Sequence, residues 1–199
     1  MWNFYARYYN LLRSNPFSKA IYKSEQQSIQ DLLGLRTTLS NEGSAADLGC
    51  GSGTNLQYIP SDITNIYALD SSTEMIAIIT DKYKDVKVSV GDVRKTHYAS
   101  GSLDLIFCIG VSEYIEDVEE LIREIKRILG KTGYIIFTSS PPHLLNRLRK
   151  LAGHCIYPNT QKNIIEIIMK NDLKILSLNR TMIQDQYLLT HNSQASMKL

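Results

Sequence analysis

The stretch Ala46-Asp47-Leu48-Gly49-Cys50-Gly51-Ser52-Gly53, residues 46–53, decides the fold of this chain. Its apolar first part passes directly into three glycines that alternate with small residues. Glycine adopts positive φ at little cost and carries no side chain, so such a loop brings backbone close to a ligand. We therefore predict a strand over 44–48, a ligand-binding loop over 49–53, and a helix that begins at about Thr54.

Outward from this loop, apolar runs of strand length alternate with helical patterns, which is typical of βαβ units and a parallel sheet. Further strands are predicted over residues 65–69, 86–90, 103–109 and 134–138, and a closing hairpin pair over 173–178 and 186–190. The expected fold is α/β. It is a doubly wound, mostly parallel seven-stranded sheet with helices on both faces and an antiparallel terminal strand.

The helix ends carry their own signals. Residues 71–74, Ser-Ser-Thr-Glu, predict a capping box for a helix that runs to Thr80. A helix over 117–129 has one apolar stripe and one charged stripe, and Glu124 belongs to the charged one. Gly130 is expected to end that helix as a C-cap before a turn over 131–133. A last helix is predicted over 160–170.

Composition limits the classes of protein. With 199 residues, 43% hydrophobic and 21% charged, the chain has room for one buried core. A net charge of +2 with a single short basic cluster disfavours nucleic acid as a partner. Three cysteines without ligand spacing argue against a disulfide framework and against structural zinc. The sequence shows no signal peptide and no membrane span, so we expect a cytoplasmic protein without stable membrane insertion.

Polar groups follow each predicted strand at its carboxyl end, where open parallel sheets bind ligands. Asp47 and the glycine loop follow the first strand, Asp70 the second, Gly91-Asp92 the third, and residues 108–114 the fourth. An acid at the end of the second strand is placed to accept hydrogen bonds from ribose hydroxyls. The pattern therefore predicts a nucleotide cofactor.

Two kinds of nucleotide cofactor fit that pattern, and the loop favours one of them. A dinucleotide fingerprint requires glycine or alanine at the sixth position, which is Thr54 counted from Gly49 and Leu56 counted from Gly51. Asp47 would repel a pyrophosphate but suits a cationic amino-acid group. An NAD-dependent oxidoreductase stays as the alternative.

Three motifs now carry a resemblance to a known family. Residues 46–53 look like motif I of class I S-adenosylmethionine (SAM)-dependent methyltransferases, 70–75 resemble the D-x-S-x-x-M motif, and 91–93 resemble G-D-h. The block from 104 to 137 is similar to the segment that ends in a K-P-G-G turn, with Thr132 in place of proline. The likeness is to the small-molecule, type 11/12 group.

The resemblance implies SAM as cofactor, S-adenosylhomocysteine (SAH) as product and no metal. Gly49 and Gly51 would lie against the methionine part, Asp70 would bind the ribose, and Asp92 would accept from the adenine amine. The remaining implied cofactor contacts are Asp47, Cys50, Asn55, Ser71, Gly91, the adenine neighbours Met75 and Val93, the backbone of Ile109, and Tyr9.

The catalytic residue stays unknown, with Glu113, Tyr114 and His143 as candidates for orienting or deprotonating a substrate. Helix capping or packing explains the first two equally well. Basic residues between 144 and 153 suit an acidic substrate or a solvated helix face. The expected reaction is methyl transfer to oxygen or nitrogen of a small acidic or aromatic molecule, with a non-catalytic SAM-binding regulator as a further alternative.

The domain prediction is a single methyltransferase domain over 1–190. It divides into an N-terminal helical lid over 1–40, a SAM-binding core over 44–140 and a substrate-side loop or helix over 141–158. A flexible tail follows over 191–199. The aromatic first twelve residues are assigned three alternative roles: packing on the sheet, covering the cofactor, or peripheral contact with a membrane. A monomer and a homodimer are both open.

Overall fold

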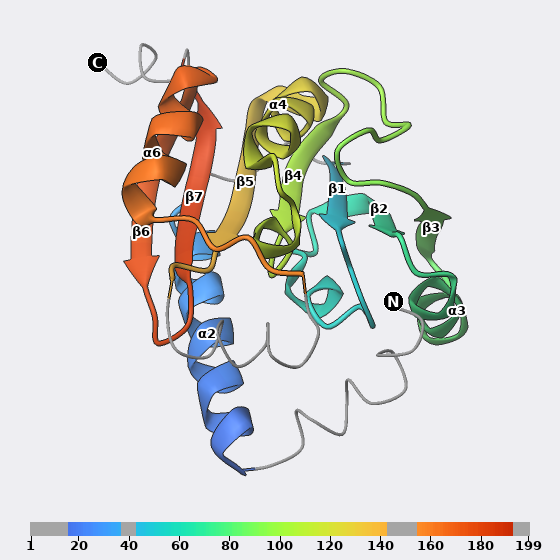
Figure 1. Ribbon diagram of the computed structural model, residues 1–199. Helices are drawn as coiled ribbons and strands as arrows, with labels where there is room; N and C mark the ends of the chain where they lie inside the picture. Colours follow the sequence, from blue (N-terminus) through green and yellow to red (C-terminus); the bar gives the residue numbers. More distant parts are fainter. Residues whose placement is uncertain (1–15, 37–42, 143–154, 193–199) are drawn as a thin grey trace.

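The computed structural model describes residues 16–36, 43–142 and 155–192, which build one sheet between two layers of helices (Figure 1). The sheet has seven strands in the order β3-β2-β1-β4-β5-β7-β6. Their bounds are β1 Gly43–Leu48, β2 Ile63–Asp70, β3 Val86–Val90, β4 Leu103–Cys108, β5 Leu129–Ser139, β6 Leu173–Arg180 and β7 Asp185–His191.

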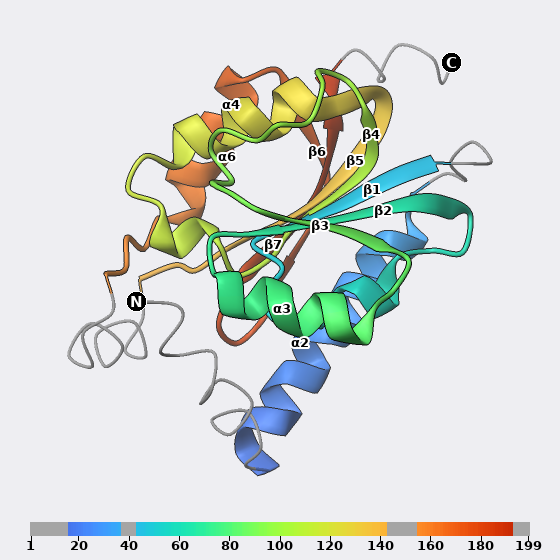
Figure 2. The same ribbon diagram turned by 90° about the vertical axis from the view of Figure 1, so that its right-hand side faces the viewer.

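Helices cover both faces of the sheet (Figure 2). Helices α4 (Val118–Ile128) and α6 (Gln161–Lys170) lie on one face, and α2 (Pro16–Gly34) and α3 (Thr73–Lys82) lie on the other. Buried residues of α4 and α6 share one apolar cluster with the sheet, and those of α2 share another with β1, β4, β5 and β7. The doubly wound α/β prediction is confirmed.

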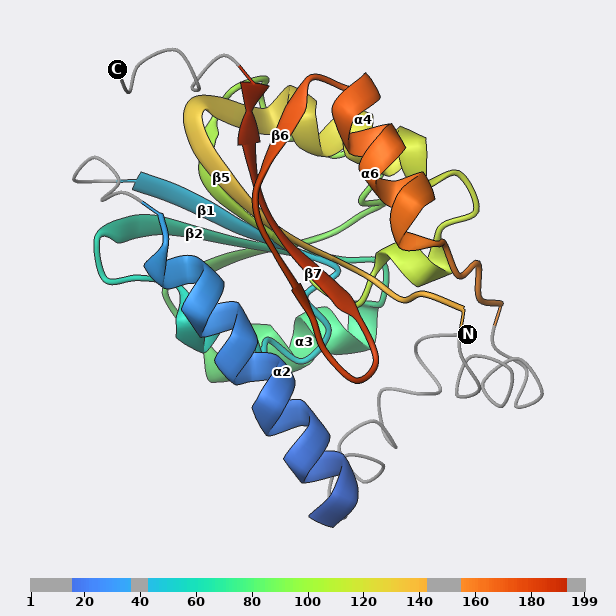
Figure 3. The ribbon, with the colours of Figure 1, turned by 90° about the vertical axis from the view of Figure 1, so that its left-hand side faces the viewer.

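The direction and register of the strands determine where a ligand site can form. The first five strands are parallel, so their carboxyl ends lie at one edge of the sheet. Strand β7 is antiparallel to β5 and to β6, and its first residue, Asp185, lies opposite Ser139 at the end of β5. The turn between β6 and β7 therefore reaches the same edge as the carboxyl ends (Figure 3).

The prediction of a helix that begins at about Thr54 is wrong. Residues Leu56–Tyr58 form only one 3-10 turn, called η1. Ile59 then has φ −65° and ψ 124° because it precedes Pro60, and proline disfavours helical backbone in the residue before it.

The expected C-cap at Gly130 is also wrong. Helix α4 ends at Ile128, and β5 begins at the next residue and continues through the predicted turn. Gly130 lies outside the positive-φ region, and a Cβ there would lie 3.2 Å from the carbonyl oxygen of Leu103. At Gly133 a Cβ would lie 2.7 Å from Leu129 Cδ1. These glycines allow close packing of β5 rather than a helix stop.

Three smaller predictions need correction. The N-cap of α3 is Ser72, whose hydroxyl accepts from the backbone N–H of Met75, so the capping box starting at Ser71 does not form. Glu124, which the sequence pattern assigns to the charged stripe of α4, is only 9% exposed. His191 belongs to β7, while 193–199 lie outside the described residues. Among the described helices, none is long and apolar enough to cross a membrane.

Candidate active site

A cavity of about 490 Å³ opens at the carboxyl edge of the sheet, within the usual size range of small-molecule sites. Loops after β1, β2, β3 and β4 form its wall, and the β6–β7 turn adds Gln184. Among the predicted cofactor contacts, those on this wall are Gly49, Cys50, Gly51, Asn55, Asp70, Ser71, Met75, Gly91, Asp92, Val93 and Ile109. Asp47 lies buried behind it, and Tyr9 falls outside the described residues.

The glycine loop combines a tight contact with open space. Gly49 has φ +70°, and a Cβ on it would lie 2.4 Å from Val111 Cγ2, so this position packs directly against the segment after β4. Gly51 has φ +51°, yet a Cβ on it would meet nothing within 4 Å. The loop therefore presents bare backbone to the cavity, as a closely bound ligand requires.

Asp70 links this loop to the start of α3. One carboxylate oxygen accepts the backbone N–H of Gly51 at 2.8 Å, and the other accepts the backbone N–H of Ser72 at 2.9 Å. A carboxylate offers about four acceptor positions, so these two bonds leave acceptor capacity on the cavity wall. Such a group can still accept from ligand hydroxyls.

Asp47 is a completely buried acid at the end of β1. Neither of its carboxylate oxygens has a hydrogen-bond partner among the described residues. Burial raises the pKa of Asp47 to about 7, and the charge of Asp70 adds to the rise, while the side chain of Asn55 partly offsets it. A buried, unsatisfied carboxylate is costly unless a donor or cation compensates it. This acid therefore fits a cationic group bound on the other side of the glycine loop.

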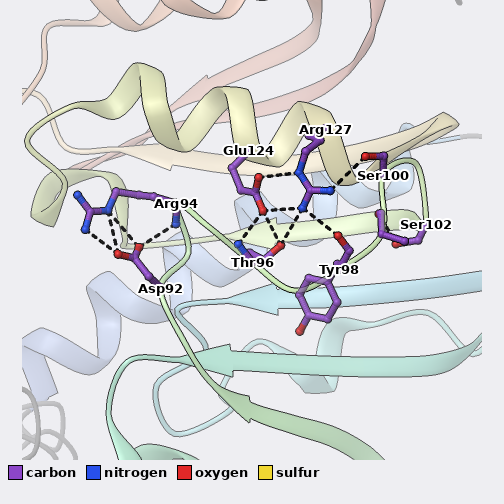
Figure 4. A network of polar contacts seen from close by, with 9 residues as sticks. Asp92, Arg94, Thr96, Tyr98, Ser100, Ser102, Glu124 and Arg127 are labelled. Atoms are coloured by element: carbon purple, nitrogen blue, oxygen red, sulfur yellow. Dashed lines mark hydrogen bonds and ion pairs between the residues drawn. The ribbon is translucent and has the colours of Figure 1, made fainter.

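Asp92 lies at the opposite end of the cavity and pairs with Arg94. The guanidinium of Arg94 donates to both carboxylate oxygens, with Nη2 to Oδ2 at 2.6 Å and Nε to Oδ1 at 3.0 Å (Figure 4). These hydrogen bonds hold the pKa of Asp92 below its usual value. Arg94 also lines the cavity and reaches Glu120 of α4 at 3.5 Å. Sequence analysis missed Arg94, and the spacing D-x-R gave no signal that the two side chains pair.

The third region of the wall follows β4. It includes Ile109, Gly110, Val111 and, from η2 (Ser112–Tyr114), Tyr114. The end of β5 fixes this segment, because Thr138 Oγ1 accepts the N–H of Gly110 at 2.8 Å and its carbonyl oxygen accepts from the Ser112 hydroxyl at 2.8 Å.

Only one of the three catalytic candidates lies on the described wall. Tyr114 lines the cavity, whereas Glu113 is buried outside the lining and its carbonyl oxygen accepts the N–H of Tyr157 at 2.7 Å. His143 falls outside the described residues. Burial raises the pKa values of Cys50 and Cys108, which disfavours a reactive thiolate at either position. No group of His, Cys, Asp or Glu suited to a metal ion occurs within the described ranges.

Gln184 is a further wall residue that sequence analysis missed. Its turn is anchored to α2, because the Thr181 hydroxyl donates to Glu25 Oε2 at 2.8 Å and Gln186 Nε2 donates to the same oxygen at 2.7 Å. A backbone hydrogen bond from the N–H of Thr181 to the carbonyl oxygen of Gln184, 3.0 Å long, closes the turn. The side-chain oxygen of Gln184 is buried without a hydrogen-bond partner among the described residues. No local pattern in the sequence signals this long-range placement.

Comparison with known proteins gives a consistent result. A family model described as a methyltransferase domain matches residues 46–137. A thiol S-methyltransferase (TMT1B) of Rattus norvegicus is 26% identical over 117 residues, 55% of this chain and 46% of that protein. A malonyl-[acyl-carrier protein] O-methyltransferase of Enterobacter lignolyticus is 24% identical over 125 residues, 63% and 50% of the two chains. The chain thus spans half or less of these relatives.

A solved structure supports the fold over a longer stretch. Magnesium protoporphyrin IX methyltransferase (ChlM) from Synechocystis PCC 6803, determined with bound SAH, superposes with a TM-score of 0.68 at 17% identity. The superposition covers 89% of this chain and 88% of that one.

Proposed function

We propose that this chain is a class I SAM-dependent methyltransferase that transfers a methyl group from SAM to a small molecule, because a family model described as a methyltransferase domain matches residues 46–137. The observation that carries the proposal is the shared cavity wall of Asp70, the glycine loop and Asp92, with the unpaired Asp47 behind it. These groups match an elongated ligand that has a cationic amino acid at one end and an adenosine at the other.

The residues suit the separate parts of that ligand. Asp47 and the backbone of Gly49 and Gly51 would hold the methionine part, and Asp70 would accept from the ribose hydroxyls. Asp92, Met75 and Val93 would surround the adenine, because they line the end of the cavity near β2 and β3. When bound, SAM supplies a methyl carbon that is already electrophilic.

The protein's task is to align the acceptor and exclude water. The wall after β4, together with Tyr114 and Gln184, forms the end of the cavity away from β3 and would take the acceptor. We propose an oxygen or nitrogen acceptor with Tyr114 as its orienting group. Its proton would pass to water as the methyl group bonds to the acceptor, leaving SAH. A metal ion has no role in this proposal.

Ligand binding separates the cofactor classes. SAM and SAH should each raise the unfolding temperature, since a ligand at 100 times its Kd stabilises the folded state by about 2.7 kcal/mol. NAD should leave it unchanged. Stabilisation by NAD alone would favour the oxidoreductase alternative.

Turnover tests the enzymatic claim. Labelled SAM should pass its methyl group to one member of a panel of acidic, aromatic, lipid-like, amine and thiol acceptors, with and without EDTA. A thiol product would replace the oxygen or nitrogen assignment, as the likeness to a thiol S-methyltransferase would allow. SAM binding without turnover of the whole panel would favour a regulatory protein.

A further inference from the structure

The segment from Gly91 to Ser102 forms the adenine end of the cavity without regular structure of its own. It leaves the edge strand β3 and crosses over β2 and β1 to reach β4. Asp92, Val93 and Arg94 at its start line the cavity. An irregular segment of this length loses much conformational entropy when it is fixed, so its position requires support from neighbouring elements.

One carboxylate on α4 provides that support. Glu124 Oε1 accepts both the backbone N–H of Thr96 at 2.7 Å and the Thr96 hydroxyl at 2.6 Å (Figure 4). Its Oε2 accepts from Arg127 Nε at 2.8 Å, and Arg127 Nη2 donates to the carbonyl oxygen of Tyr98 at 2.8 Å. Glu124 and Arg127 together hold the middle of the segment against α4.

The burial of the Glu124 carboxylate costs hydration free energy, so stability of the fold is a poor explanation for an acid at this position. Glu124 is buried beside the apolar stripe of α4, where an aliphatic side chain would continue the core contacts of Leu121, Ile125 and Ile128. The side chain of Arg127 is 38% exposed, so the carboxylate of Glu124 is the member of the pair that loses its hydration on folding. A departure from the expected pattern next to a ligand cavity is typical of a functional requirement.

A second link joins the same helix to the cavity wall. Arg94 holds Asp92 with its guanidinium and approaches Glu120, one turn before Glu124 on α4, at 3.5 Å. The orientation of Asp92 therefore depends on α4 at two points. The ring of Tyr98 gives the segment a further contact, since it packs edge-on against Tyr67 with centroids 5.5 Å apart.

We propose that Glu124 is a positioning residue for the cofactor: by holding Thr96 and Arg127 it fixes Asp92 and Val93 at the adenine end of the cavity. This inference rests on the proposed function, because it takes the adenosine of SAM as the ligand of that end. Glu124 itself does not line the cavity and acts only through the segment.

The test is a double-mutant cycle on SAH affinity, measured by calorimetry on the full chain. Glu124→Gln and Asp92→Asn should each weaken SAH binding about tenfold, because each disturbs a charged hydrogen-bond acceptor. If Glu124 acts through Asp92, the double variant should bind within about threefold of the weaker single variant. Glu119→Gln, which breaks an ion pair of α4 with Lys170 away from the cavity, should bind like the wild type.

The outcomes are distinct. Wild-type binding by Glu124→Gln, or a double variant that loses the product of both single effects, overturns the inference. Failure of the wild-type chain to bind SAH overturns the proposed function and the inference with it. Should Glu124→Gln not fold, Thr96→Val removes one bond to the same carboxylate. With an unchanged circular dichroism spectrum it should bind SAH about threefold more weakly, and unchanged affinity would refute the proposal.

Discussion

The carboxylate of Asp70 accepts the backbone N–H of Gly51 at 2.8 Å, so one acid both shapes the glycine loop and faces the cavity. Strands β1 and β2 are parallel neighbours, and this bond ties together the loops that follow them. The loop is therefore held in place before any ligand binds. Preorganisation of this kind lowers the entropy cost of binding.

Asp70→Ala should weaken SAM binding by about 1.5 to 3 kcal/mol, because it removes the ribose acceptor and frees the loop. Isothermal titration with SAM measures the effect. Asp81→Ala is the matched control, since its carboxylate lies on α3 and is 94% exposed. Unchanged SAM affinity of Asp70→Ala would remove this acid from the ribose site.

The two glycines at the start of the loop should respond differently to alanine. Gly49→Ala should lower the free energy of unfolding by about 2 to 4 kcal/mol, because it adds a left-handed backbone cost to a contact with Val111. Adding Val111→Ala should restore part of that loss. Denaturant unfolding of the three chains measures it, and equal stability of wild type and Gly49→Ala would contradict the packing described.

Gly51→Ala should retain more stability and lose binding. Its added methyl group meets no protein atom within 4 Å, so only the backbone cost of about 1 to 2 kcal/mol remains. The methyl group would occupy space at the cavity wall, and SAH affinity should fall by roughly tenfold. Calorimetry and unfolding on the same preparation separate the two effects. An alanine variant that binds SAH normally would show that the ligand does not approach this backbone.

Much of this site was predictable because its residues follow strands. Asp47 and Asp70 lie at the ends of β1 and β2, and Asp92 follows β3 after Gly91, and parallel strands bring such positions to one edge whatever the details of packing. Glu124 and Gln184 carry no such mark. Glu124 contacts the β3–β4 segment because of the way in which α4 packs against that segment. Gln184 reaches the cavity because the β6–β7 turn lies beside the end of β5. Both depend on tertiary contacts that periodicity does not encode.

Asp47 should make stability depend on pH. Its folded pKa of about 7 lies above the ordinary value of 3.8. Between these values the folded chain keeps a proton that the unfolded chain has released. The contribution of Asp47 to the free energy of unfolding therefore falls as the pH rises from 4 to 7, and it is constant above that. Asp47→Asn should accordingly unfold at a higher temperature than the wild type at pH 8, as thermal scans would show.

Binding should follow the opposite trend. The ionised form of Asp47 would pair with the amino group of SAM, so affinity of the wild type should rise with pH up to about 7 and then level off. Asp47→Asn should bind more weakly at pH 8 and lose this dependence. Titrations in buffers of different ionisation enthalpy would count the proton released on binding. A wild-type affinity that does not change between pH 5.5 and 7.5 would exclude Asp47 from the ligand site.

Gln184 and Tyr114 should affect the acceptor and leave the cofactor alone. Tyr114 lines the cavity from the segment that follows β4, and Gln184 lines it from the β6–β7 turn, whereas the proposed adenine end lies at β3. Gln184→Ala and Tyr114→Phe should lower kcat/KM for the methyl acceptor by about 10- to 100-fold, because a bound polar group would lose its partner. The KM for SAM and the Kd for SAH should stay within about twofold of the wild type.

The matched control for this pair is Met182→Ala, which alters the same turn at a side chain that is 72% exposed and absent from the cavity wall. It should leave both substrates unaffected. A fall in SAH affinity equal to the fall in kcat/KM for Gln184→Ala would instead place this carboxamide at the cofactor end. The acceptor site would then consist of Tyr114 and the segment after β4, because no other residue of the β6–β7 turn lines the described cavity.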